Sequence, residues 1–388
     1  MKNLALERER IESDAKRKLL KIEESVKIKS EKIAKQAADK LKKIDELEKQ
    51  SNKIIPIFFA SDANYLPYLS VALNSLKDNA NKNYVYKIYI LHNGITQKEQ
   101  LPVKNFEENG FFVEFINVSE KLEEVKNGLQ LRDYYTGATY YRIFIANMFP
   151  EYDKALYLDS DIIVLGDISK LYNYDLKNNL VGAVCDRVVS GHHTFQSYSR
   201  EVLGIEPQNY FNAGILLMNL KKFRTDGFYE SFKSLLSEYK FCVAQDQDYL
   251  NVICKDKVKY LPYSWNTMPV GGEGKNLPNL IHYNLTLKPW HYADIPYAKH
   301  FWKYAQVSSY SNEIRRAFGE HTLDKKLQDD KTEAHLLALA QAEIDREDNF
   351  IKARKNRKAD DFNVFENVFS DDIFCLEDQP FNVIGAKN

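Results

Sequence analysis

The chain has 388 residues, of which 44% are hydrophobic and 13% aromatic, enough to bury a large core. Its 54 Lys and Arg nearly balance 55 Asp and Glu, and this net charge of -1 argues against a nucleic-acid-binding protein, which needs clustered positive charge. No apolar run reaches the roughly 18–20 residues that cross a bilayer, and no signal peptide is evident, so we expect a soluble, cytoplasmic protein.

Residues 1–53 contain no aromatic residue, glycine or proline and are rich in Lys, Glu and Arg. Ile11, Ile22, Ile33 and Ile44 recur every eleven residues, which predicts one long helix with an apolar stripe. One interpretation is a coiled coil that joins copies of the chain into a homo-oligomer. The alternatives are a solvated helix that frays and a helix that contacts anionic lipid through its lysines.

From Ile54 to about Tyr304, short apolar runs alternate with helical patterns, which is typical of βαβ units around a largely parallel sheet. We expect helices over 65–76, 139–149 and 228–239. We expect strands over 54–60, 84–91, 111–118, 154–158, 180–185 and 213–218. The pattern therefore predicts an α/β domain over residues 54–304.

Residues 305–388 lack this strand pattern. A charged amphipathic helix is expected over 323–350, and the basic run 352–358 and an acidic, aromatic tail follow it. Tails of this composition are flexible or fold on a partner. We expect a helical and partly disordered C-terminal extension, and we assign no chemistry to it.

Asp159 and Asp161 directly follow the apolar strand expected at 154–158. Residues i and i+2 of an extended segment point to the same side, so both carboxylates can face one point. Open α/β sheets bind ligands at the carboxyl ends of their strands, and paired carboxylates suit Mg²⁺ or Mn²⁺. Taken alone, the pair is also compatible with a turn that carries two solvated acids.

The Asp159 and Asp161 pair lies in one of six short segments that occur in order over residues 54–303 and that strengthen its interpretation as a ligand site. They are FASDANY at 59–65, TYYR at 139–142, LYLDSDIIV at 156–164, FNAG at 211–214, QDQD at 245–248 and HYNLTLKPW at 282–290. In these segments the chain resembles the retaining nucleotide-sugar glycosyltransferases of glycosyltransferase family 8, of the bacterial lipopolysaccharide galactosyl- and glucosyltransferase type. The resemblance implies a GT-A type fold with a Rossmann-like mixed sheet.

The resemblance also implies a UDP-galactose or UDP-glucose donor and a metal ion, Mn²⁺ or alternatively Mg²⁺. The metal ligands would be Asp159, Asp161 and His282. Asp62 and Asn64 would hold the uridine, although both residues could instead cap the helix that follows. The nucleotide-binding positions that match the family are Ala60, Ser61, Asp62, Asn64 and Ser160.

At the reacting end, Lys288 matches a lysine that reaches the diphosphate, where its positive charge offsets the charge of the departing UDP. The positions that match the family's donor-sugar contacts are Arg142, Asp186, Asn212, Ala213, Asp246 and Gln247. Gln247 stands where the family places its group nearest to the reacting carbon, with Asp248 as the alternative nucleophile. Because no clean carboxylate pair is present, we favour same-face transfer over a covalent intermediate.

One position departs from the family pattern. Leu285 stands three residues after the expected metal ligand His282, where the family usually has a glycine. If Leu285 has a negative φ and points outward, activity survives; otherwise we expect weakened UDP binding.

The sequence thus predicts transfer of a hexose to a saccharide acceptor, such as lipopolysaccharide or another surface glycan. If the acceptor is lipid-linked, the enzyme meets the inner face of the cytoplasmic membrane through residues 352–358 or the N-terminal helix. Two alternatives are an inactive glycosyltransferase-like scaffold assembled through residues 1–53 and a metal-dependent hydrolase.

Overall fold

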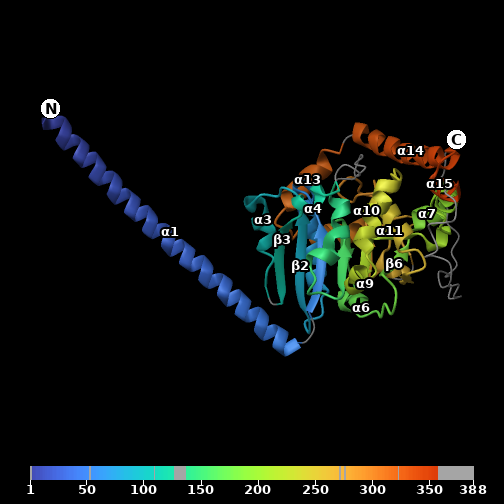
Figure 1. The fold of residues 1–388 in the computed structure, drawn as a ribbon, viewed down its shortest axis with the longest axis horizontal. Helices are drawn as coiled ribbons and strands as arrows, with labels where there is room; N and C mark the ends of the chain where they lie inside the picture. Colours follow the sequence, from blue (N-terminus) through green and yellow to red (C-terminus); the bar gives the residue numbers. More distant parts are fainter. Residues whose placement is uncertain are drawn as a thin grey trace. The chain divides into compact units, whose positions relative to one another are not determined.

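The computed structural model describes residues 2–51, 54–108, 110–125, 137–270, 272–274, 277–321 and 323–356. It divides into two compact units, Met1–Ile54 and Ile55–Asn388, which are considered separately (Figure 1). The end of the expected basic run, residues 357–358, and the acidic tail lie outside the described residues.

The first unit is helix α1, Lys2–Ser51. Lys, Glu, Leu and Ala, which favour helices, dominate this segment, and no glycine or proline interrupts it. The side chains of residues 16–40 are exposed, including Ile22 and Ile33 of the apolar stripe at 59% and 65%. Pairing of this helix with a partner therefore stays a prediction. No helix in the described part of the chain combines the length and apolar character that crossing a bilayer requires.

The second unit is built on a seven-stranded sheet in the order β3-β2-β1-β4-β7-β6-β8 (Figure 1). Strand β7 runs antiparallel to both of its neighbours, β4 and β6, whereas β1–β4, β2–β3 and β6–β8 are parallel pairs. The expected mixed α/β fold is confirmed. The sheet strands are β1 (Ile54–Ala60), β2 (Val85–His92), β3 (Phe111–Asn117), β4 (Ala155–Leu158), β6 (Val181–Cys185), β7 (Phe211–Met218) and β8 (Val258–Tyr260).

Helices connect these strands. The α-helices of the second unit are α2 (Leu66–Asp78), α3 (Gln97–Lys104), α4 (Ser119–Glu123), α5 (Ile145–Met148), α6 (Ile168–Tyr172), α7 (Arg187–Gly191), α8 (His193–Ser197), α9 (Leu220–Thr225), α10 (Phe228–Glu238), α11 (Asp246–Ile253), α12 (Ala298–Ala305), α13 (Ser311–Gly319), α14 (Leu323–Asp345) and α15 (Phe350–Asn356). The 3-10 helix η3 (Gly137–Phe144) and the π-helix η4 (Tyr198–Leu203) also contribute to the site described below.

The central strands are buried on both faces, which explains their uninterrupted apolar sequences. Successive side chains of a strand point to opposite faces of the sheet. Phe58 of β1 and Tyr157 of β4 therefore pack in one core. Their neighbours Phe59 and Leu158 pack in the core on the other face. Asp159, two residues after Tyr157, continues the line of the first face toward the carboxyl end of β4.

A small second sheet places the next acidic residue. Strand β5, Ile162–Val164, pairs antiparallel with β9, Leu280–His282, and Ile162 lies opposite His282. Helix α2 holds β5 in place: Ser75 Oγ accepts a hydrogen bond from Val164 N at 2.9 Å, and Asn79 Nδ2 donates to Val164 O at 3.0 Å. Both backbone groups of this buried residue are thus satisfied by the side chains of Ser75 on α2 and of Asn79, which follows the last residue of α2.

The segment expected as one α-helix over 139–149 has a different form. Residues Gly137–Phe144 are a 3-10 helix, and only Ile145–Met148 are α-helical. Within this segment the guanidinium of Arg142 is buried in the site, where its Nε donates to the Thr139 carbonyl at 2.8 Å and lies 2.9 Å from Oδ2 of the distant Asp246. Apolar periodicity alone does not reveal such a constraint.

The C-terminal helices pack on the second unit. Phe350 of α15 is buried against Tyr239 and Phe241, with ring centroids 5.5 and 5.1 Å away. Lys352, from the expected basic run, donates to the carbonyls of Ile344 and Arg346 at the end of α14. This part of the extension therefore belongs to the core of the second unit, and the ammonium of Lys352 satisfies helix-terminal carbonyls.

Replacing Ser75 with alanine is predicted to destabilise the protein, because the buried Val164 N–H loses its acceptor. The free energy of unfolding should fall by about 1–3 kcal/mol, measured by urea denaturation. Ser237→Ala, which removes an exposed hydroxyl on α10, is the matched control. Equal stabilities of the two variants would contradict this account of how β5 is held.

Candidate active site

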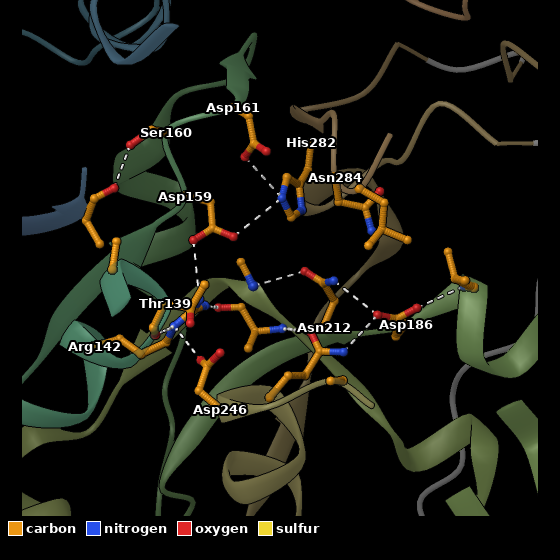
Figure 2. Close-up of a pocket in the computed structure, with 18 of the residues that line it drawn as sticks. Thr139, Arg142, Asp159, Ser160, Asp161, Asp186, Asn212, Asp246, His282 and Asn284 are labelled. Atoms are coloured by element: carbon orange, nitrogen blue, oxygen red, sulfur yellow. Dashed lines mark hydrogen bonds and ion pairs between the residues drawn. The ribbon is translucent and has the colours of Figure 1, made fainter. Parts of the chain in front are cut away.

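A pocket lies at the carboxyl ends of β1, β4 and β6 and is lined by most of the side chains predicted from the sequence (Figure 2). Those lining it are Ala60, Ser61, Asp62, Arg142, Asp159, Ser160, Asp161, Asp186, Asn212, Ala213, Asp246, Gln247, His282 and Lys288. Asn64 and Asp248 are not among the lining residues. The fold thus brings together segments that are more than 200 residues apart in sequence.

Asp159, Asp161 and His282 converge on one side of the pocket (Figure 2). Nε2 of His282 lies 3.6 Å from Oδ2 of Asp159 and 3.3 Å from Oδ1 of Asp161. The latter oxygen is buried and has no hydrogen-bond partner. Nδ1 of His282 lies 3.1 Å from Oδ1 of Asn266, which orients the ring. Two carboxylates and an imidazole nitrogen form a ligand set that fits a divalent cation.

Gly214 gives these side chains the space to converge. Asp159 N donates to Gly214 O at 2.8 Å, so the backbone of β7 passes directly beneath the site. A Cβ atom at residue 214 would lie 2.3 Å from Cε1 of His282 and 2.6 Å from Oδ2 of Asp159. No side chain fits there without displacing both groups, so the FNAG segment serves the site by close approach.

Lys288 forms a buried ion pair with Asp161. Its ammonium contacts Oδ2 of Asp161 and also donates to the carbonyl of Tyr283. Burial alone would raise the pKa of Asp161, but the charges of Lys288 and His282 outweigh it and hold this pKa well below its usual range. Asp161 is therefore ionised at neutral pH and ready to bind a cation.

Arg142 links the two acidic ends of the pocket. Its Nε lies 2.9 Å from Oδ2 of Asp246, its Nη2 lies 3.6 Å from Oδ1 of Asp159, and the guanidinium packs over the ring of Tyr157. Burial raises the pKa of Asp246 to about 7, although Arg142 opposes the shift. This carboxyl therefore changes its protonation state near neutral pH.

The opposite end of the pocket holds a network of amides and one carboxylate (Figure 2). Oδ2 of Asp186 accepts from Asn212 Nδ2 at 3.0 Å and from Gln247 Nε2 at 3.2 Å. Gln247 Oε1 in turn accepts from Ala213 N at 2.9 Å. Asp186 follows β6, and the other groups come from β7 and α11; their mutual bonds fix the orientation of each amide at the pocket wall.

The end of β1 supplies the third group of polar atoms. Asp62 caps the turn that follows: its Oδ1 accepts from Asn64 N at 2.9 Å and from Tyr65 N at 3.1 Å. Ser160 Oγ donates to Ala60 O at 2.8 Å and ties this turn to the end of β4. The capping alternative for Asp62 is thus realised, while the residue also lines the pocket.

Asp248 points away from the pocket space. Its carboxylate accepts from the hydroxyls of Tyr210 at 2.7 Å and Tyr198 at 2.9 Å and from Ala244 N at 2.9 Å, and it is fully buried. Both tyrosines line the pocket in front of it. In this position Asp248 orients two hydroxyls at the wall. Asn64 has an exposed side chain, and its backbone supports Asp62.

Leu285 has φ +53°, in the left-handed region that glycine adopts most readily, and its side chain lines the pocket. The backbone therefore keeps the conformation of a glycine position. Of the two outcomes predicted for this residue, the geometry corresponds to the one that weakens UDP binding.

The lining residues that the sequence analysis did not assign to the site are mostly aromatic or apolar. Tyr157 could have been found, because it precedes Asp159 by two residues on the same face, and its hydroxyl donates to Asp159 Oδ1 at 2.8 Å. Leu336 of α14 could not have been found from the sequence, because nothing in the pattern of a charged helix indicates contact with a distant pocket. The other unassigned lining residues are Tyr65, Ala138, Thr139, Val188, Val189, Phe195, Tyr198, Tyr210, Gly214, Val243, Ala244 and Asn284.

The charges of the lining residues do not balance. Five carboxylates face Arg142, Lys288 and the imidazole of His282. A diphosphate would meet net repulsion here unless a further cation were present. The excess of negative charge, the buried Oδ1 of Asp161 without a partner and the converging ligand set together fit a divalent metal ion.

Comparison with known proteins places the site in context. The family model described as Glycosyl transferase family 8 matches residues 56–294. A Haemophilus influenzae protein that carries a provisional glycosyltransferase name is 31% identical over 238 residues, 61% of this chain and 70% of that protein. The Escherichia coli lipopolysaccharide 1,2-glucosyltransferase is 28% identical over 276 residues, 65% of this chain and 77% of that protein.

A solved structure shows the same architecture. The crystal structure of the galactosyltransferase LgtC in complex with donor and acceptor sugar analogs superposes with a TM-score of 0.58 and 29% sequence identity. The alignment covers 66% of this chain and 96% of that one.

Gly214→Ala is predicted to weaken Mn²⁺ binding by about tenfold or more, because the new methyl group must displace His282 and Asp159. Isothermal titration calorimetry with Mn²⁺ measures the effect. Gly319→Ala is the matched control, since a Cβ at that position meets nothing within 4 Å. Unchanged Mn²⁺ affinity in Gly214→Ala would refute the metal-binding role of this cluster.

Proposed function

Because the chain belongs to glycosyltransferase family 8, we propose that it is a metal-dependent retaining hexosyltransferase. It moves galactose or glucose from a UDP-sugar to a saccharide acceptor. The observation that carries the proposal is the convergence of Asp159, Asp161 and His282 over Gly214, with Lys288 beside them. We further propose lipopolysaccharide or another surface glycan as the acceptor. The name of the Escherichia coli relative supports this choice.

In this proposal the uridine binds at the end of β1. Asp62 and the backbone of Ala60 and Ser61 offer hydrogen-bonding groups there, and the ring of Tyr65 offers a flat face on which a base can stack. Ser160 keeps this turn close to the paired carboxylates. UDP bound in this way would extend from the end of β1, which holds the base, to the end of the adjacent strand β4, which lies beside the diphosphate.

The diphosphate lies between the ligand cluster and Lys288. When bound by Asp159, Asp161 and His282, Mn²⁺ (or Mg²⁺) offsets the negative charge of the diphosphate. Lys288 leaves its ion pair with Asp161 and places its ammonium on the departing UDP. A buried lysine suits this role because the surrounding low dielectric strengthens its interaction with phosphate.

The hexose occupies the amide-rich end of the pocket. Asp186, Asn212 and Asp246 present oxygens and an amide to its hydroxyls, while Arg142 holds Asp246 in place. The bond between the anomeric carbon and the UDP oxygen breaks. The acceptor oxygen then bonds to the same face of that carbon, and its proton passes to the departing diphosphate oxygen. Gln247 lies at the wall where its amide can stabilise the positive charge that develops on the sugar.

Same-face transfer is favoured over a covalent intermediate because of the position of Asp248. Its carboxylate accepts three hydrogen bonds behind Tyr198 and Tyr210, so it does not face the space in which a sugar would lie. Gln247, whose amide is a poor nucleophile, lines the pocket instead.

An inactive scaffold is the second candidate, and one observation favours it. Leu285 intrudes on the wall beside His282 in a backbone conformation that favours glycine. If the side chain blocks the phosphates, the domain would bind donor poorly, and helix α1 would carry the function. Donor binding separates the two candidates.

Asp161→Asn is predicted to abolish stabilisation by donor, because it removes a metal ligand while preserving shape. With UDP at about 100 times its dissociation constant in the presence of Mn²⁺, the wild-type protein should gain about 2.7 kcal/mol. Thermal unfolding with a panel of UDP-hexoses measures the effect, and Asp39→Asn on the exposed part of α1 is the control. If no UDP-hexose stabilised the wild-type protein, the scaffold function would replace the enzyme.

Leu285→Gly is predicted to tighten UDP binding several-fold, because it removes a side chain from the pocket wall at a left-handed position. A several-fold gain in affinity corresponds to roughly 1 kcal/mol of binding free energy. The backbone strain that glycine relieves is present with and without UDP, so its relief raises the stability of the protein and not the affinity. Calorimetric titration with UDP and Mn²⁺ tests this. Leu277→Gly, which alters an exposed leucine, should change nothing. Weaker UDP binding by Leu285→Gly would show that the leucine contributes to the donor site.

A further inference from the structure

Helix α1 carries an apolar stripe that is exposed along the part of the helix whose side chains the structure describes. Leu19, Ile22, Val26 and Ile33 form this stripe, and their side chains are between 58% and 65% exposed. Successive stripe positions are three or four residues apart, with Ser30 as the polar member between Val26 and Ile33, so all of them lie on one face of the helix. Removing such a face from water favours association with another surface.

The stripe keeps its direction along the helix. It repeats every eleven residues, which is three full turns, so a straight or slightly right-handed pair of helices can bury it continuously. Leu20 and Ile28 are also exposed, at 58% and 60%, but they lie off this face, six and two residues from Val26. They therefore distinguish an effect of the stripe from an effect of apolar character in general.

The positions directly beside the stripe carry opposite charges on its two flanks. On one flank a lysine directly precedes a stripe position in each repeat, at Lys18, Lys29 and Lys40. On the other flank, the position that directly follows an isoleucine of the repeat is Glu12, Glu23, Ala34 and Asp45 in turn. One flank is therefore basic and the other is mainly acidic.

This arrangement of charge selects one orientation of a second copy. In two parallel helices in register, the basic flank of each helix faces the acidic flank of the other, and Lys18 of one copy lies against Glu23 of the second copy. In an antiparallel pair, lysines would face lysines and acids would face acids. The charges thus complement each other only in the parallel pair.

The same flanks argue against a lipid surface as the occupant of the stripe. Helices that lie on anionic membranes carry Lys and Arg across the polar face and aromatic or leucine side chains on the apolar one. Residues 1–53 contain no aromatic residue, and Glu23 directly borders the stripe. Anionic headgroups would repel this flank, whereas the lysines of a second copy would attract it.

We propose that α1 pairs with α1 of a second copy of this chain, parallel and in register, and that the protein is a homodimer. Because α1 ends at Ser51 and β1 begins at Ile54, the second units of both copies are joined to the same end of the paired helices. A dimer of this kind offers two pockets to an acceptor that displays many glycans, which raises avidity without a new contact. The pairing itself does not depend on the reaction proposed above.

Sedimentation equilibrium of the full-length chain tests the pairing. We expect a mass twice the 45.2 kDa of one chain. Ile22→Glu combined with Ile33→Glu should weaken dimerisation roughly tenfold or more, because it places charges in the seam. Leu20→Glu combined with Ile28→Glu, at equally exposed positions off the stripe, should leave the dimer intact. Glu favours helices, and far-ultraviolet circular dichroism checks that both variants keep their helix.

Two results would overturn the pairing. One is a wild-type chain that sediments with the mass of a single copy across the micromolar range, whether or not it binds vesicles of phosphatidylserine. The other is equal dimerisation of the stripe variant and the off-stripe variant.

Disulfide cross-linking tests the orientation. A parallel pair in register brings identical residues together, so Leu19→Cys and Ala37→Cys should each form cross-linked dimers on mild oxidation. These positions lie about 27 Å apart along the helix, so in an antiparallel pair at most one of them can meet its own copy. The wild-type chain, with its own four cysteines, gives the background. Cross-linking of only one variant, or of neither, would overturn the parallel arrangement.

A charge exchange tests the contact between the flanks. Lys18→Glu should weaken the dimer several-fold, because it places two glutamates against each other, and adding Glu23→Lys should restore the affinity. Both side chains are exposed on α1, so the exchange alters no packing within one copy. If Lys18→Glu left the dimer unchanged or tightened it, the proposed facing of the two flanks would be wrong.

Discussion

Buried carboxylates that outnumber the cations beside them are the constraint on which this structure depends. Asp159 and Asp161 follow β4, and Asp246 begins α11. Arg142 is shared between Asp159, Asp246 and a backbone carbonyl, and Lys288 between Asp161 and a backbone carbonyl. The two ends differ in their electrostatics: despite burial, the charges of Lys288 and His282 hold the pKa of Asp161 low, whereas burial raises the pKa of Asp246 to about 7. A divalent cation would relieve the repulsion at the first end and create a place for a diphosphate.

The fold creates this arrangement by bringing backbone segments unusually close. Asp159 ends β4, Gly214 lies opposite it on antiparallel β7, and His282 ends β9 beside the start of β5. Because Gly214 has no side chain, the imidazole of His282 and the carboxylate of Asp159 can occupy the space above it. The convergence of the polar side chains therefore depends on one absent side chain as much as on the groups that are present.

The sequence predicted the features that follow from local patterns. Strand 54–60 was predicted with its observed bounds, and the i, i+2 spacing of Asp159 and Asp161 correctly indicated that their carboxylates converge. Features set by distant contacts were missed. Arg142 is buried in the site on a 3-10 segment where an α-helix was expected, and Leu336 reaches the pocket from a helix whose charged sequence resembles a solvated surface. Side-chain periodicity indicates which face of a helix or strand is buried, but it does not indicate which distant residues pack against that face.

The central claim is that Asp159, Asp161 and His282 hold a divalent ion that pairs with the diphosphate of UDP. A crystal structure of the chain with UDP and Mn²⁺, with anomalous data collected at the manganese edge, tests it most directly. We predict one anomalous peak bonded to these three side chains and to UDP phosphate oxygens, with Lys288 released from Asp161. UDP bound in the pocket with no peak at this position and the Lys288–Asp161 pair intact would contradict it.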